Sequence, residues 1–185
     1  PMLIGVTGAP ADSGYVGGWG FGPVAPSAWE LFGEGDSRRE GSILNFYEEF
    51  PELKLGEERW QYTGLFLKKY VARINGTHGQ LADGDMNYGN NVRVYRYAET
   101  LLNAAELAVL TGKDGSKYLQ EVRQRANCTD TGVSREDIIE ERHKEFVGEG
   151  KRYWDLVRSG LAEQVLKADN HEWRTIDWNP GKKYW

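Results

Sequence analysis

The sequence is poor in several features that define common protein classes. It has a single cysteine, Cys128, which excludes an internal disulfide framework. We expect this side chain to be a small, partly buried hydrophobic group rather than a nucleophile. No apolar run approaches the ~20 residues that a membrane-spanning helix needs, and no signal peptide is present. The chain begins with Pro1 rather than Met, so we expect a piece of a longer protein.

Positive charge and catalytic motifs are also scarce. The 23 Lys and Arg residues are outnumbered by 28 Asp and Glu residues, which gives a net charge of −5. Nucleic-acid binders usually carry a basic surface, so we expect no nucleic-acid partner. The three histidines are scattered without metal-binding spacing, and neither a serine elbow nor a phosphate-binding loop is found. The sequence therefore predicts neither an enzyme of these classes nor a cofactor.

Residues 83–87 (Asp-Gly-Asp-Met-Asn) have the spacing that begins a calcium-binding loop. Such a loop needs glycine at its sixth position and a bidentate glutamate at its twelfth. Tyr88 and Val94 stand at those two positions. We therefore interpret the segment as a solvated turn and expect no metal site.

Helical periodicity is the main structural signal in the chain. Apolar residues recur at helical spacing over 93–110, 116–126 and 134–147, and the short links between these segments favour antiparallel packing. The aromatic residues Tyr97, Tyr118 and Trp154 lie on apolar stripes, so we expect them in the core. A short helix over 26–32 and a short strand over 42–47 are also expected. The predicted fold is mostly α, with long irregular loops and little β, in a single domain over residues 1–185.

The segment 134–160 combines an apolar stripe with many charges. Ser134 and Asp137 have the spacing of an N-terminal helix cap. We predict that Arg152 and Asp155, with Glu141 or Glu145, form a partly buried cluster of ion pairs. Glu141, Glu145 and Glu149 could supply the two carboxylates of a glycosidase on paper. Neighbouring Arg and Lys residues lower carboxylate pKa values, however, so we expect a structural role and no enzyme activity.

The same segment carries a resemblance to a known family. Residues 140–160, EERHKEFVGEGKRYWDLVRSG, resemble the C-terminal signature of the SusD/RagB-like nutrient-binding proteins. Residues 96–106 and 122–126 resemble two further motifs of that family, and the helix pair that contains them is similar to a tetratricopeptide unit. The resemblance covers roughly residues 19–161 and implies a helical, tetratricopeptide-related fold.

The resemblance also implies a function. Proteins of this family bind glycans on the extracellular face of the bacterial outer membrane, as lipoproteins of polysaccharide-utilisation systems. They pass an oligosaccharide or polysaccharide to a SusC-like TonB-dependent transporter, and they are not enzymes. The resemblance places the lipid anchor on a missing N-terminal part of the protein. Loops determine which glycan such a protein binds.

A candidate ligand site lies in the glycine-rich segment 1–26, which is either a flexible end or an ordered loop. Pyranose rings pack on aromatic faces, and glycine lets the backbone turn such rings outward. We therefore expect Trp19 to contact glycan, followed by Tyr15 and Phe21. Two alternatives remain open: Trp19 could plug the helical core, and the chain could be a helical-repeat interaction scaffold without direct sugar binding.

Overall fold

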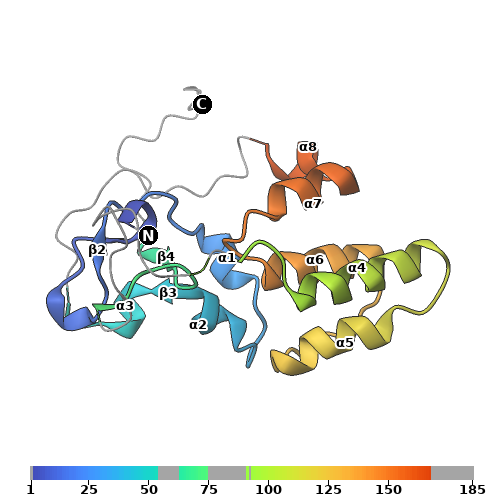
Figure 1. Cartoon of the computed structure of the whole chain (residues 1–185), viewed down its shortest axis with the longest axis horizontal. Coiled ribbons are helices and arrows are strands. Elements are labelled where there is room, and N and C mark those ends of the chain that lie inside the picture. The colour runs from blue at the N-terminus through green and yellow to red at the C-terminus, as the bar shows by residue number, and fades with distance from the viewer. Residues whose placement is uncertain (1, 54–62, 75–90, 92, 168–185) are drawn as a thin grey trace. The chain divides into compact units, whose positions relative to one another are not determined.

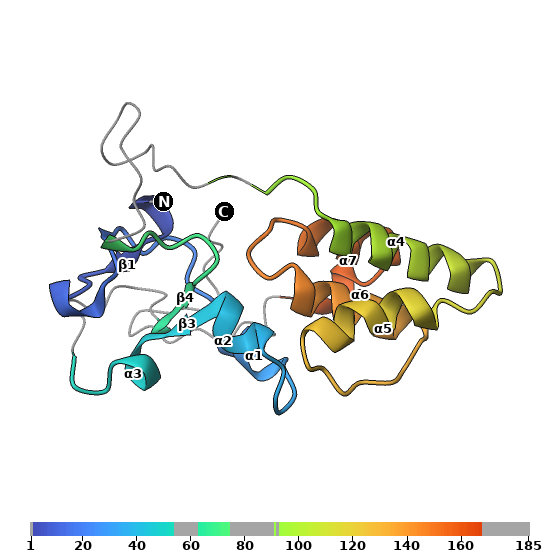
Figure 2. The same cartoon turned by 60° about the horizontal axis from the view of Figure 1, so that its bottom comes forward.

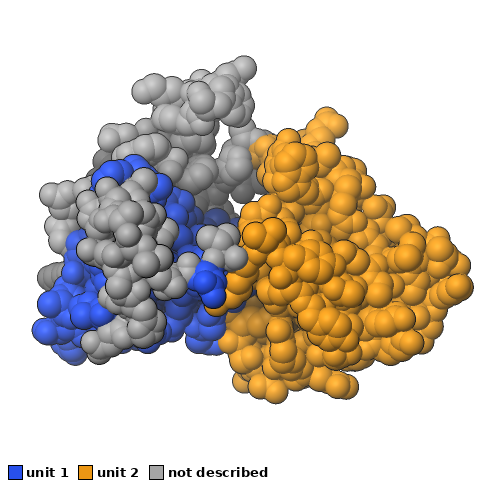
Figure 3. Space-filling view, in the orientation of Figure 1, with its two compact units in different colours: residues 1–29, 40–92, 168–185 blue, residues 30–39, 93–167 orange. Residues whose placement is uncertain are grey.

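The computed structural model describes residues 2–53, 63–74, 91 and 93–167. They belong to two compact units, which Figure 3 colours separately: residues 1–29, 40–92 and 168–185 form unit 1, and residues 30–39 and 93–167 form unit 2. Helices predominate over short strands, so the prediction of a mostly α fold with little β is confirmed. The calcium-like segment 83–87 lies outside the described residues.

Unit 1 is built from short elements. Two small sheets pair β1 (Val6–Thr7) in parallel with β2 (Gly17–Gly18), and β3 (Ile43–Asn45) antiparallel with β4 (Leu65–Leu67). The helices are the 3-10 helices η1 (Met2–Ile4) and η2 (Ala11–Ser13), and the α-helices α1 (Pro26–Glu30), α2 (Arg38–Ser42) and α3 (Phe46–Glu49). The last residue of α1 and the first two of α2 are assigned to unit 2. The core of unit 1 contains Val6, Tyr15, Leu44, Phe46, Phe66 and Val71.

The predicted short helix and short strand in this region are both present, but each is shorter than expected. The strand over 42–47 is observed as β3, which ends at Asn45. Phe46, which is fully buried, begins α3 directly after it. The predicted helix over 26–32 is observed as α1 and ends at Glu30.

Unit 2 is a helical bundle. It contains α4 (Tyr97–Leu110), α5 (Ser116–Arg125), α6 (Arg135–Glu145), α7 (Arg152–Ser159) and α8 (Ala162–Val165). Figures 1 and 2 both show α4, α5 and α6 side by side, as the short links predicted. One apolar cluster joins these three helices, with members that include Leu102, Ala105, Leu119, Val122 and Ile138.

The helix ends of unit 2 follow local chemistry. The Ser134 side chain accepts from the Asp137 backbone N–H, and the Asp137 side chain accepts from the Ser134 backbone, so the predicted cap of α6 is confirmed. Gly148 and Gly150, both at positive φ, interrupt the helical conformation between α6 and α7. The helix predicted from residue 93 begins only at Tyr97, because Arg96 is extended.

The predicted core positions of two aromatic residues are wrong. Tyr97 is 65% exposed and Trp154 is 66% exposed, whereas Tyr118 packs partly buried against the core. In α4 the buried face is formed by Ala98, Leu101 and Leu102, and Tyr97 lies outside it. In α7 the buried residues are Asp155 and Leu156, so the aromatic side of that helix faces outward. None of the helices in the described ranges is both long and apolar enough to span a bilayer.

Candidate functional site

An exposed pair of aromatic rings follows β2 in unit 1. Trp19 is 47% exposed and Phe21 is 54% exposed. Their ring centroids lie 5.9 Å apart at an interplanar angle of 85°, which is the edge-to-face arrangement that aromatic pairs prefer. Two such rings in mutual contact form an apolar platform that water can reach.

The backbone holds this pair in place. The N–H of Gly20 donates to the Gly5 carbonyl (3.0 Å), and the N–H of Phe21 donates to the Leu3 carbonyl (2.7 Å). Gly20 has φ of 70°, and a Cβ at this position would lie 1.9 Å from Oγ1 of Thr7. Glycine is therefore required between the two rings, and the segment is an ordered loop in this structure.

Tyr15 lies on the inside of the same segment and is only 3% exposed. Its hydroxyl donates to Glu49 Oε1 (3.1 Å) and accepts from Arg73 Nη2 (3.2 Å). Burial, followed by the charge of Glu49, raises the pKa of Tyr15 to about 12, although the charge of Arg73 opposes this shift. Because its ring face is not offered to a ligand, the expectation of a direct glycan contact is corrected for Tyr15. It remains a prediction for Trp19 and Phe21.

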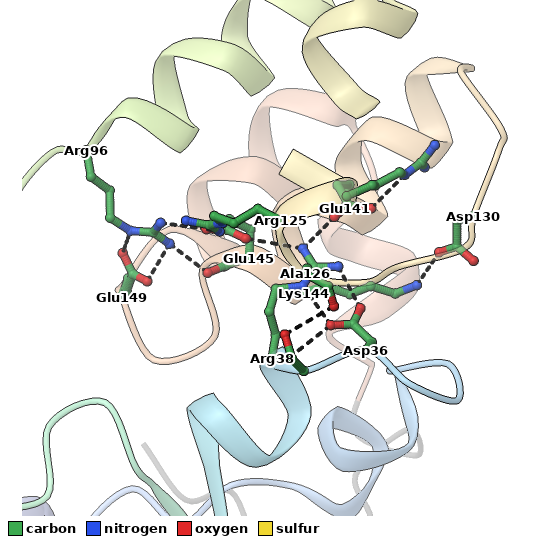
Figure 4. A network of polar contacts seen from close by, with 12 residues as sticks. Asp36, Arg38, Arg96, Arg125, Ala126, Asp130, Glu141, Lys144, Glu145 and Glu149 are labelled. Carbon is green, nitrogen blue, oxygen red and sulfur yellow. Dashed lines mark hydrogen bonds and ion pairs between the residues drawn. The ribbon is translucent and has the colours of Figure 1, made fainter. Parts of the chain in front are cut away.

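The second candidate is the charged cluster of unit 2, which centres on two buried carboxylates (Figure 4). Glu141 accepts from Arg38 (2.5 Å) and from Arg123 (2.9 Å). Glu145 accepts from Arg38 (3.2 Å), Arg96 (2.5 Å) and Arg125. Both glutamates are at most 2% exposed, so these ion pairs lie inside the helical unit.

The electrostatics of this cluster favour a structural role. Burial disfavours ionisation of Glu145, but hydrogen bonds from Arg125 and Arg96 outweigh it and lower the pKa of this carboxyl. For Asp36, burial is likewise outweighed by the hydrogen bonds from Arg38, and its pKa is also lowered. A general acid needs a raised pKa near neutral pH, so these carboxyls are poorly suited to glycoside hydrolysis.

The membership of the cluster differs from the prediction. Asp155 is paired with Arg142 (2.9 Å) and Arg158 (2.8 Å), and neither of these arginines pairs with Glu141 or Glu145. Arg152 makes no ion pair with any described residue, and its buried Nη1 has no acceptor there. The glutamates are instead paired with Arg38, which lies 103 residues before Glu141 in the chain. Local spacing alone could not reveal a partner that folding brings from so far away.

Three potential metal ligands also approach each other in unit 2. Atoms of Cys128, Asp130 and Glu141 lie within 4.8 Å of one another, beside a polar pocket. Lys144 Nζ already binds Asp130 (2.6 Å), and two arginines bind Glu141. Burial raises the pKa of the Cys128 thiol, which disfavours the thiolate that a metal requires. These residues therefore do not fit a metal site.

Comparison with known proteins places this geometry in context. The sequence model of the SusD family matches residues 54–184. The chain is 34% identical over 93 residues to the starch-binding protein SusD of Bacteroides thetaiotaomicron, which corresponds to 49% of this chain and 16% of that protein.

Solved structures match over nearly the whole chain. Surface glycan-binding protein A from Bacteroides thetaiotaomicron, solved alone and with laminarihexaose, is 41% identical, with a TM-score of 0.82 over 97% of this chain and 41% of that one. A laminarin-binding SusD-like protein is 32% identical, with a TM-score of 0.75 over 95% of this chain and 39% of that one. The chain thus spans about two fifths of the length of these solved relatives.

Proposed function

The chain belongs to the SusD family, and from this premise we propose that it is part of a surface glycan-binding protein, with Trp19 and Phe21 in the binding surface. The observation that carries the proposal is the exposed Trp19–Phe21 pair on a backbone that requires Gly20. An apolar platform held rigidly before ligand arrives is what sugar rings need. The relatives are named as starch-binding or glycan-binding proteins, which agrees with the expectation that this chain is not an enzyme.

We further propose a laminarin-type glucan as the ligand class. The relative solved with laminarihexaose and the laminarin-binding relative each align with at least 95% of this chain. Because loops determine specificity, a likeness that includes the loops of unit 1 supports this ligand class.

The partner and location follow from the family in the same proposal. The whole protein would reside on the outer membrane, held by a lipid anchor outside these 185 residues. It would pass its oligosaccharide to a SusC-like TonB-dependent transporter.

Calorimetry of the longer parent protein tests the glycan proposal. We expect Trp19→Ala to weaken binding of laminarihexaose at least about tenfold, or ~1.4 kcal/mol, because a stacking surface is lost. Phe21→Ala should act in the same direction. Tyr95→Ala is the matched control, since Tyr95 is another aromatic residue with 58% exposure but lies in unit 2. Circular dichroism of each variant confirms folding.

Two results would contradict parts of this proposal. Unchanged affinity of the Trp19→Ala variant would remove the aromatic pair from the binding surface. Tighter binding of a starch-derived hexasaccharide than of laminarihexaose would reject the ligand class. If the unmodified parent binds no glycan, the result would instead favour an interaction scaffold without direct sugar binding.

A further inference from the structure

Helix α7 has its apolar side turned outward. Tyr153, Trp154 and Val157 are 55%, 66% and 47% exposed, and the first two rings are in contact, with centroids 5.2 Å apart. We call these three residues the α7 outer face. Amphipathic helices normally bury such a face, and contiguous exposed apolar patches mark interaction sites.

The inner side of α7 is held largely by charge. Asp155 pairs with Arg142 (2.9 Å), and Arg158 pairs with Glu106 (2.5 Å). Leu156 is the buried apolar side chain of this helix. The orientation of α7 is therefore fixed by specific polar partners on α4 and α6, and the exposed aromatic pair is not the result of a loosely attached helix.

The chemistry of the α7 outer face fits protein better than sugar. Its third member, Val157, extends an apolar surface, and Leu166 just after α8 is also 45% exposed. The nearby cations Lys151 and Arg158 are already paired with Glu99 and Glu106. A sugar would find few free polar groups for its hydroxyls, whereas an apolar protein surface needs none.

We propose that the α7 outer face packs, in the parent protein, against the part of the chain that lies outside these 185 residues. The solved relatives continue for more than half of their length beyond the aligned region. Helical repeats cannot bury their apolar faces alone and do so by stacking on neighbours. Leu107 and Leu110 of α4 are also more than half exposed, so the helical unit has further apolar surface for such a neighbour. A segment of the same chain reaches this surface at a high effective concentration.

Hydroxyl-radical footprinting of the purified parent, read by mass spectrometry, tests this inference without glycan. Oxidation of Trp154 and Tyr153 is measured in the folded monomer and in the urea-unfolded chain. We expect at least about fivefold protection of both rings in the folded monomer, as for side chains that become buried. Oxidation of Trp154 at about two thirds of the unfolded rate would overturn the proposal. Protection that appears only as protein concentration rises would also overturn it, because a second copy would then be the occupant.

A pair of variants provides an independent readout. We expect Trp154→Ser to lower the melting temperature of the parent by several degrees, while Gln124→Ser changes it by about one degree or less. Gln124 is an exposed residue near the end of α5, so both variants place serine in a helix. Equal, small shifts for the two variants would mean that Trp154 is open to solvent in the parent and would overturn the proposal. Glycan affinity is not used in either test, so failure of the glycan proposal leaves both results interpretable.

Discussion

Glu145 illustrates how much one buried charge depends on its partners. Its carboxylate is 2% exposed and accepts from Arg38, Arg96 and Arg125. We expect Glu145→Ala to lower the free energy of unfolding by ~1–3 kcal/mol, because Arg38 and Arg96 each lose one acceptor and keep another, Glu141 for Arg38 and Glu149 for Arg96. Urea denaturation followed by far-ultraviolet circular dichroism measures this loss.

Arg152→Met is the contrasting variant. Arg152 is partly buried, and its Nη1 has no acceptor among the described residues. Methionine keeps much of the apolar volume and removes the desolvated charge, so we expect a change within about 1 kcal/mol or a gain in stability. A loss as large as that of Glu145→Ala would contradict the assignment of Arg152 as unpaired.

His143 should make stability depend on pH. Burial, followed by the charge of Arg152, lowers its pKa from 6.5 to about 4, although Asp155 opposes the shift. His143 is therefore protonated near pH 6.5 in the unfolded chain, but only near pH 4 in the folded protein. The contribution of His143 to the free energy of unfolding is complete above pH 6.5. It falls by up to about 3 kcal/mol as the pH drops from 6.5 to 4.

The variant His143→Gln separates this effect from the carboxylates. Glu145 and Asp36 have pKa values lowered from 4.5 and 3.8, so their contributions are lost only below those values. Between pH 6.5 and 4.5, urea midpoints of the variant should therefore change less with pH than those of the unmodified protein. Identical slopes would show that His143 does not titrate as its surroundings suggest.

Among the elements, the β1–β2 ribbon depends on one glycine. A Cβ on Gly20 would clash with Thr7, and its φ of 70° disfavours any side chain. We expect Gly20→Ala to cost ~1–3 kcal/mol and to weaken glycan binding, because it displaces Trp19 or Phe21. Gly17→Ala is the control: Gly17 lies in β2, and a Cβ there meets no atom within 4 Å. Equal effects in thermal melts would show that the conformation at Gly20 is not essential.

The helices could be predicted from the sequence because their causes are local. The Ser134 cap and the glycines at 148 and 150 act within a few residues; they place the start of α6 correctly and its end to within two residues. The sidedness of α7 could not be predicted in this way. Its apolar residues suggest a buried face, but Arg142 and Glu106 bind the opposite side and turn Trp154 outward. Apolar periodicity indicates which residues share a face of a helix. Tertiary contacts determine whether that face is buried or exposed.

For the whole molecule, family membership was recognisable in residues 140–160, whereas the charge network behind that motif was not. Arg38, the first residue of α2, lies far away in sequence, binds Glu141 and is itself held by Asp36. In the glycine-rich start of the chain, Trp19 and Phe21 are exposed and their glycan contact stays a prediction, whereas Tyr15 is buried. All three aromatic residues lie in a similar glycine-rich context, and nothing local distinguishes the ring that packs on Phe50 and under Arg73.

Amide hydrogen exchange of the parent with and without laminarihexaose tests where the molecule binds its ligand. The proposed surface belongs to unit 1, while the apolar cluster of α4, α5 and α6 belongs to unit 2. Ligand on the Trp19–Phe21 pair should suppress opening of the hydrogen bonds that Gly20 and Phe21 donate to Gly5 and Leu3. We therefore expect slower exchange over residues 3–21 and little change within α4–α6. Protection confined to the helical bundle would place the glycan on unit 2 and would make the aromatic pair of α7 the stronger candidate.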